Sequence, residues 1–198
     1  MARRLVLAAQ TLATTEDFTT RVAASAEAGF RAIGLRPADY RRARDAGLTD
    51  AQMRKILTWY GVQVAELSVL IGFSGDERSR QTEETMYRIA QALGGEYLMT
   101  ITEIEDSVER TAEAFAALCD RAAAHGLRVA LEFLPWTTVP DAATAWEIVR
   151  LADRPNGGIL IDSWHHFRGA RDDAQLLAVP PERVVAVQID DADAEPVG

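Results

Sequence analysis

Short runs of β-type residues alternate with longer amphipathic segments along this chain, and this alternation constrains the fold more than any other feature. Strands that are separated by helices in this way run parallel and are joined by right-handed crossovers. The predicted strands cover residues 5–9, 32–35, 62–70, 97–101, 129–133, 159–161 and 184–189. The predicted helices cover residues 16–28, 49–60, 76–93, 106–125, 141–151 and 172–177.

The predicted strands are apolar almost throughout, which is typical of a parallel sheet with both faces covered. An open doubly wound sheet is an alternative, but no Gly-x-Gly-x-x-Gly turn follows the first strand. We therefore predict an α/β fold of the (β/α)8 TIM-barrel type. Such barrels take about 250 residues, whereas this sequence has 198 and ends after a seventh strand.

The predicted organisation is one β/α-barrel domain over residues 1–198 that lacks the last helix-strand-helix unit. Without an eighth strand, the first and seventh strands each keep an unpaired edge, and exposed edges favour association. We expect either a homo-oligomer or further residues outside this sequence.

The charge balance excludes several classes of partner. The net charge is −9, so the surface repels nucleic acid and anionic membranes. No apolar stretch approaches the roughly twenty residues that a membrane span needs. The single cysteine, Cys119, cannot form an internal disulfide, which suits a reducing compartment. We expect a cytoplasmic protein without nucleic-acid or membrane partners.

Polar side chains stand at the ends of three late strands. Glu132 closes the fifth predicted strand, Asp162 follows the sixth, and Gln188 lies near the end of the seventh. In a parallel barrel these positions surround the mouth where active sites are built. Buried carboxylates are costly unless a partner compensates them, and a divalent cation is a common partner. The pattern indicates an oxygen-rich metal site.

The segments that carry these residues are ALEF at 130–133, LIDSWH at 160–165 and VQIDDA at 187–192. They resemble the xylose isomerase-like TIM barrel superfamily, which contains the sugar phosphate isomerase/epimerase family and is related to 3-dehydroshikimate dehydratase and inosose dehydratase. The resemblance implies that Glu132, Asp162 and Gln188 bind one divalent cation (Mn²⁺, Mg²⁺, Co²⁺ or Zn²⁺). It also implies that His165 faces the substrate and that Asp191 supports the ligands. The family's fourth ligand, a glutamate on strand eight, has no counterpart here.

Such a site suits a small sugar or polyol-derived hydroxy-ketone. A cation held by carboxylate and amide oxygens prefers hydroxyl and carbonyl oxygens as its remaining ligands. It polarises the carbonyl, acidifies the adjacent C–H and stabilises the enediolate. A carboxylate or histidine then moves the proton, and we expect Glu132 and His165 to be the catalytic residues.

We predict a divalent-metal-dependent isomerase/epimerase of carbohydrate metabolism that acts through this enediolate. A metal-dependent lyase of the dehydroshikimate dehydratase or inosose dehydratase type is the first alternative. Gln188 favours it, because many epimerases have histidine there. A non-catalytic truncated barrel is the second. Related DNA-repair enzymes use several histidines and a basic face, which three histidines and an acidic chain exclude.

The two carboxylates also have structural interpretations. Instead of binding a metal ion, Glu132 could form an ion pair with an arginine at the barrel rim. Asp162 has the alternative of capping the turn that follows it, through the backbone amides of Trp164 and His165.

Three flanking side chains are further candidates for substrate binding. Glu66 on the third strand, Trp164 and Arg168 are expected near the mouth. Each also has an interpretation without substrate. Glu66 could form an ion pair at the barrel rim, Trp164 could pack against neighbouring side chains, and Arg168 could lie in a solvated loop. Arg36, after the second strand, has the same pair of interpretations as Glu66.

Overall fold

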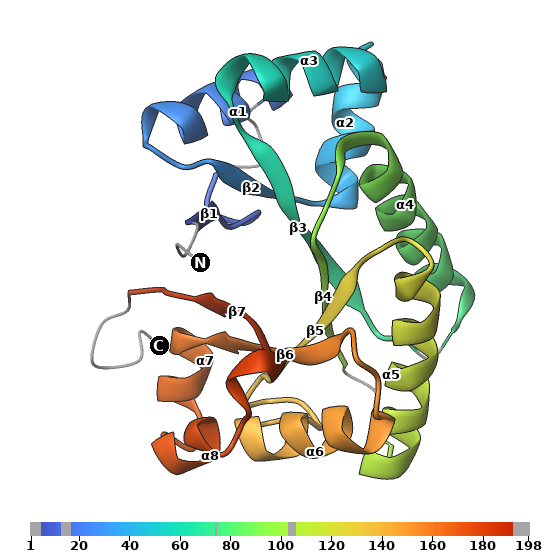
Figure 1. Ribbon diagram of the computed structural model, residues 1–198, viewed down its shortest axis with the longest axis vertical. Coiled ribbons are helices and arrows are strands. Elements are labelled where there is room, and N and C mark those ends of the chain that lie inside the picture. The colour runs from blue at the N-terminus through green and yellow to red at the C-terminus, as the bar shows by residue number, and fades with distance from the viewer. Residues whose placement is uncertain (1–4, 13–16, 74, 103–105, 192–198) are drawn as a thin grey trace.

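The computed structural model describes residues 5–12, 17–73, 75–102 and 106–191, and their strands form one parallel sheet in sequence order (Figure 1). The seven strands are β1 (Val6–Leu7), β2 (Ala32–Leu35), β3 (Gln63–Ile71), β4 (Tyr97–Ile101), β5 (Arg128–Glu132), β6 (Gly157–Asp162) and β7 (Val184–Gln188). Figure 1 shows the sheet curving with the helices along its outer side. The predicted α/β fold of the TIM-barrel type is confirmed, with seven parallel strands in the described residues.

The helices follow the strands as the alternation predicts. They are α1 (Phe18–Glu27), α2 (Pro37–Asp45), α3 (Asp50–Tyr60), α4 (Glu77–Leu93), α5 (Val108–Ala123), α6 (Ala142–Ala152), α7 (Ser163–Arg168) and α8 (Asp173–Leu177), and a 3-10 turn covers Pro181–Arg183. Each expected helix is present, although the predicted start of the first one at residue 16 lies outside the described residues. None of the helices in the described parts of the chain is long and apolar enough to cross a membrane.

Local sequence signals set most helix ends. Thr49 accepts a hydrogen bond from the Gln52 amide while the Gln52 side chain bonds back to it, which forms a capping box before α3. Gly61 then ends α3 in a left-handed conformation. Asp76 and Asp141 cap α4 and α6 in the same way as Thr49 caps α3, through a side-chain oxygen.

Two helices, α2 and α7, were not expected from the sequence. The residues of α2 are strongly polar, so no apolar stripe marks it, although Pro37 occupies a favoured first-turn position. The residues of α7 follow β6 without any linker, because Asp162 serves as both the last strand residue and the helix cap.

The core has two parts of unequal size. The larger cluster packs the outer face of the sheet against the helices, with Met53, Phe115 and Leu131 among its fully buried members. The smaller cluster, of Tyr97, Ala130 and Leu160, contains strand residues alone and fills the inside of the curve. Polar side chains on the same inward face therefore gather beyond it, at the carboxyl ends of the strands.

Candidate metal centre

Glu132, Asp162 and His165 come together at the mouth of the barrel. Glu132 ends β5, Asp162 ends β6, and His165 lies in the first turn of α7. One ligating atom of each lies within 4.8 Å of the others, and Nε2 of His165 is 3.6 Å from Oε1 of Glu132. Both carboxylates are buried, with exposed fractions of 3% and 6%. The structure thus brings together three residues that the sequence singled out.

The environment of Glu132 disfavours its charged form. Burial raises the pKa of Glu132 to about 8, and repulsion from Asp162, Glu66 and Asp190 adds to the effect. No arginine pairs with Glu132 in the described residues; its neighbour is His165. A divalent cation among these carboxylates would compensate the repulsion, so the donor set fits a metal ion.

The environment of His165 favours its neutral form. Burial lowers the pKa of His165, with an opposing contribution from Asp190, and this favours the neutral imidazole. Its Nδ1 is buried and has no hydrogen-bond partner among the described residues. A neutral imidazole with a free nitrogen is able to accept a proton or to bind a metal ion.

Asp162 caps the turn that follows it. Its Oδ1 accepts hydrogen bonds from the backbone amides of Trp164, at 2.7 Å, and His165, at 3.1 Å. The capping interpretation is therefore confirmed. These two hydrogen bonds fix the orientation of the Asp162 carboxylate, and its role as a metal ligand stays a prediction.

Asp190 lies next to Asp191, which was chosen from the same acidic stretch as the supporting residue, and it lines the cavity that contains the cluster. Its backbone amide donates to Oγ of Ser163 at 2.9 Å, which ties the loop after β7 to α7. Burial and a hydrogen bond with Asp162 raise the pKa of Asp190. The role predicted for the adjacent Asp191 stays a prediction.

Gln188 lies beside Asp162 in the β6–β7 register. Its Nε2 donates to Oε2 of Glu66 at 3.1 Å. A carboxylate only accepts, so the amide nitrogen must face Glu66 and the amide oxygen faces away from it. Glu66 is itself buried and also accepts from the hydroxyl of Tyr97 at 3.0 Å and the backbone amide of Ala9 at 3.4 Å.

The site opens into a cavity of about 410 Å³ at the mouth of the barrel. It is lined by Ala8, Gln10, Thr11, Glu66, Ser68, Val69, Met99, Ile101, Glu132, Leu134, Trp136, Asp162, His165, Gln188 and Asp190. Trp164 and Arg168 are not among these residues. Trp164 packs edge-on against His165 and Trp136. The guanidinium of Arg168 lies 5.9 Å from the ring centre of Trp164.

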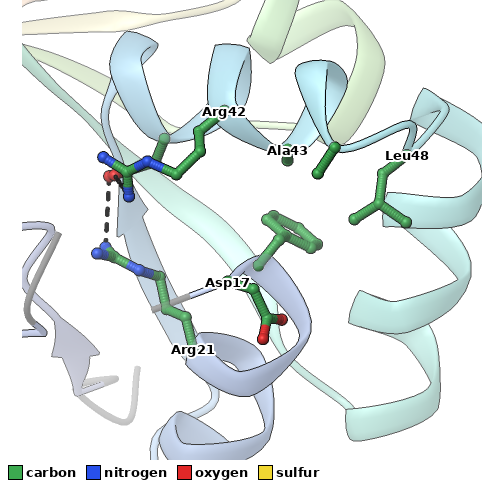
Figure 2. A pocket seen from close by; sticks show the side chains of 8 residues that line it. Asp17, Arg21, Arg42, Ala43 and Leu48 are labelled. Atoms are coloured by element: carbon green, nitrogen blue, oxygen red, sulfur yellow. Dashed lines mark ion pairs between the residues drawn. The ribbon is translucent and has the colours of Figure 1, made fainter. Parts of the chain in front are cut away.

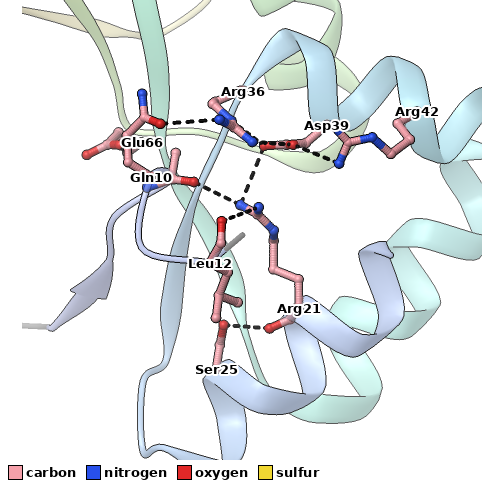
Figure 3. A network of polar contacts seen from close by, with 9 residues as sticks. Gln10, Leu12, Arg21, Ser25, Arg36, Asp39, Arg42 and Glu66 are labelled. Carbon is pink, nitrogen blue, oxygen red and sulfur yellow. Dashed lines mark hydrogen bonds and ion pairs between the residues drawn. The ribbon is translucent and has the colours of Figure 1, made fainter. Parts of the chain in front are cut away.

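Gln10 lines the cavity and was missed by the sequence analysis. Figure 3 shows the polar network beside it. Its Oε1 accepts from Nη1 of Arg36 at 3.2 Å, and Arg36 makes two 2.8 Å hydrogen bonds with the carboxylate of Asp39. The pairing interpretation of Arg36 is confirmed. The alternation pattern that located the strands carries no signal for Gln10, because its role depends on a residue 26 positions away.

A second pocket, of about 170 Å³, lies beside α1 and α2 (Figure 2). Phe18, Ala43 and Leu48 give it a mainly apolar lining, and it shares no lining residue with the carboxylate cavity. Arg21 and Arg42 both reach Asp39 at its edge, at 3.4 and 3.6 Å. This pocket is separate from the candidate metal centre.

A curved sheet of parallel strands with its polar site at the carboxyl ends defines a protein of the β/α-barrel class. The family model described as xylose isomerase-like TIM barrel matches residues 22–198. The chain belongs to this family, as its resemblance predicted.

Two curated proteins are similar to the chain. A 3-dehydroshikimate dehydratase of Pseudomonas aeruginosa is 27% identical over 150 residues, which cover 71% of this chain and 24% of that protein. An inosose isomerase of Bacillus subtilis is 28% identical over 132 residues, which cover 66% of this chain and 46% of that protein. The chain therefore matches less than half the length of these relatives.

A solved structure of the IolI protein with a binding zinc atom has the same fold. The superposition gives a TM-score of 0.87 at 20% identity and covers 99% of this chain and 76% of that one.

Proposed function

We propose that this chain is a divalent-metal-dependent isomerase or epimerase that acts on a small sugar or polyol-derived hydroxy-ketone. The observation that carries the proposal is the Glu132–Asp162–His165 cluster, buried at the mouth of a barrel beside a cavity of about 410 Å³. The similarity to an inosose isomerase supports it.

Glu132, Asp162 and Gln188 are the proposed ligands of one Mn²⁺, Mg²⁺, Co²⁺ or Zn²⁺ ion. Two carboxylates and an amide oxygen form a hard donor set, which suits such cations and leaves positions for substrate oxygens. The bound ion supplies a Lewis acid that polarises a substrate carbonyl. The similar IolI structure has a bound zinc atom, which supports a metal ion in this chain as well.

His165 is the proposed proton acceptor for a substrate carbon next to the carbonyl. Burial lowers the pKa of His165, which favours the neutral imidazole, and its Nδ1 has no partner among the described residues. Glu132, whose Oε1 lies 3.6 Å from Nε2 of His165, is the second proposed catalytic group. Return of the proton to the opposite face gives epimerisation, and return to the neighbouring carbon gives isomerisation.

A lyase of the 3-dehydroshikimate dehydratase type is the second candidate. Two observations favour it: the amide at Gln188 and the similarity to the Pseudomonas dehydratase. The two reactions share their first proton transfer and differ in whether a hydroxyl leaves. Assays that follow ultraviolet absorption of a conjugated product and exchange of a substrate proton with deuterium separate them.

The metal site is tested by thermal unfolding of the chain with and without Mn²⁺, repeated on Glu132→Gln. At about a hundredfold excess over the dissociation constant, the ion should stabilise the fold by about 2.7 kcal/mol. Glu147→Gln is the matched control, because Glu147 pairs with Arg150 on the exposed surface of α6. The proposal is supported if Mn²⁺ stabilises both the parent chain and Glu147→Gln but does not stabilise Glu132→Gln. No stabilisation of the parent contradicts it and favours a non-catalytic barrel.

We also propose a homo-oligomer. In the described residues β1 pairs with β2 and β7 with β6, so each keeps one edge without a strand partner. Leu5, Val187 and Ile189 are exposed near these edges. Sedimentation equilibrium that fits a monomer at all concentrations would contradict this proposal.

A further inference from the structure

The wall of the cavity formed by β3 and the residues after β1 offers, besides the carboxylate of Glu66, the uncharged polar groups of Gln10 and Ser68. We propose that Gln10 and Ser68 form a subsite for hydroxyl groups, and that this subsite selects an uncharged, polyhydroxylated substrate over a phosphorylated or carboxylated one. The proposal rests on the proposed function of the same cavity and names the class of substrate.

Ser68 supplies a hydroxyl that lacks a partner. It lies on β3, is only 2% exposed and lines the cavity. Its Oγ is buried without a hydrogen-bond partner among the described residues. A buried hydroxyl left unpaired is unfavourable. Because a hydroxyl both donates and accepts, it is suited to bind another hydroxyl.

Gln10 supplies an oriented amide. Arg36 donates to its Oε1, so the amide nitrogen is directed away from Arg36 and remains available as a donor at the cavity. Arg36 is itself fixed by two hydrogen bonds with Asp39, which Arg21 and Arg42 also approach. Figure 3 shows this chain of contacts leading from α2 to Gln10.

The same network holds the backbone beside Gln10. Nη1 of the buried Arg21 donates to the carbonyl of Ala9 at 3.0 Å, and Nη2 donates to the carbonyl of Leu12 at 3.3 Å. The loop after β1 is therefore anchored on both sides of Gln10. A donor whose support is rigid loses little entropy when it binds a ligand.

The charges around the cavity argue against an anionic substrate. Four carboxylates line it, from Glu66, Glu132, Asp162 and Asp190, and no lysine or arginine is among its lining residues in the described chain. These four carboxylates outnumber the two positive charges that a divalent cation would supply. The nearby guanidinium of Arg36 is compensated by Asp39. A phosphate or carboxylate would meet repulsion without an arginine or lysine to bind it.

The test compares two ligands that differ by one phosphate, D-fructose and D-fructose 6-phosphate. Their binding is measured by calorimetry or saturation-transfer NMR at 0.15 M salt, with and without Mn²⁺. We expect D-fructose to bind at least tenfold more tightly. Ser68→Ala should weaken D-fructose binding roughly 2- to 10-fold, as for loss of one hydrogen bond, and should leave the affinity for Mn²⁺ unchanged.

Ser79→Ala is the matched control, because Ser79 is a buried serine of α4 whose hydroxyl donates to the backbone of Asp76. It should not alter binding of either ligand. Equal or tighter binding of the phosphate, no effect of Ser68→Ala, or no binding of D-fructose to the chain would each overturn the subsite. Failure of the proposed metal site has a different result, since Mn²⁺ then gives no thermal stabilisation. In that case D-fructose binding by the parent and by Ser68→Ala is still compared in the absence of metal.

Discussion

The amide nitrogen of Gln188 lies 3.1 Å from Oε2 of Glu66, and this hydrogen bond joins β7 to β3 across the inside of the open barrel. Glu66 also accepts from Tyr97 on β4 and from the backbone of Ala9 just after β1. One buried carboxylate therefore connects the two ends of the sheet, where β1 and β7 do not pair in the described residues. It also fixes the Gln188 amide with its nitrogen, rather than its oxygen, toward Glu66.

Substitution of Glu66 by glutamine should weaken metal binding. The glutamine amide has a single acceptor oxygen and a nitrogen that only donates. It therefore cannot accept all three hydrogen bonds that the Glu66 carboxylate accepts. Gln188 then loses its fixed orientation, and loss of such supporting contacts costs roughly tenfold or more in metal affinity. The measurement is Mn²⁺ titration followed by electron paramagnetic resonance. Glu83→Gln, which alters a buried carboxylate paired with Arg121, is the control and should bind Mn²⁺ as the parent does.

Substitution of Gly34 by alanine should disturb the same contact from β2. A Cβ at this position would lie 2.6 Å from the Ala9 amide nitrogen and 2.7 Å from Oε1 of Glu66. Relief of both contacts requires the Ala9 backbone and the hydrogen-bonded Glu66 carboxylate to move. We therefore expect the free energy of unfolding to fall by about 1–3 kcal/mol. Denaturant titration measures it. In Gly95→Ala the new Cβ meets the flexible end of Leu67 at 3.3 Å, and a loss as large there would contradict the explanation.

The stability of the metal-free protein should fall between about pH 4.5 and pH 8. The pKa of Glu132 is raised from 4.5 to about 8 in the folded state, chiefly by burial. The contribution of Glu132 to the free energy of unfolding is fully present below its pKa in the unfolded chain. This contribution, on the order of a few kcal/mol, is lost as the pH rises through the pKa of the folded state. Glu132→Gln carries no charge at any pH, so its unfolding free energy should fall less over this range. Parallel curves for parent and variant would refute the assignment.

Metal binding should strengthen with pH over the same interval. A cation must displace the proton from Glu132, whose pKa is about 8, so binding releases a proton. The apparent affinity for Mn²⁺ should rise by up to roughly tenfold per pH unit below pH 8 and level off above it. Calorimetry in buffers of different ionisation enthalpy counts the released protons. Affinity that stays constant from pH 6 to pH 8 would show that Glu132 is not a ligand.

Substitution of Asp39 by asparagine should destabilise the fold and loosen the loop that carries Gln10. Asp39 is buried and pairs with Arg21, Arg36 and Arg42. Removal of one charge from a buried group of this kind costs roughly 3–5 kcal/mol. Glu147→Gln breaks an exposed pair within α6 and should cost less than about 1 kcal/mol. Urea unfolding of both variants gives the comparison, and equal small losses would contradict a structural role for the cluster.

The fold was largely predictable because its signals are local. Apolar runs of strand length, helix caps such as Thr49 and stops such as Gly61 lie within a few residues of the elements they define. The helices α2 and α7 were the exceptions. The short helix α7 follows β6 directly. The residues of α2 are strongly polar, and its buried carboxylate, Asp39, pairs with Arg21 of α1. No periodicity in the sequence reports such a pairing.

The sequence by itself determined the alternating parallel architecture and the carboxylates at the ends of β5 and β6, since chain order and strand ends place them at one mouth. Only the tertiary structure decided that Glu66 connects β1, β4 and β7, that Asp190 joins the acidic cluster, and that Arg36 orients Gln10. These contacts depend on strand register and barrel curvature, which bring side chains as far as 122 residues apart within hydrogen-bonding distance. Register and curvature result from packing of the whole sheet, and no short segment of sequence encodes them.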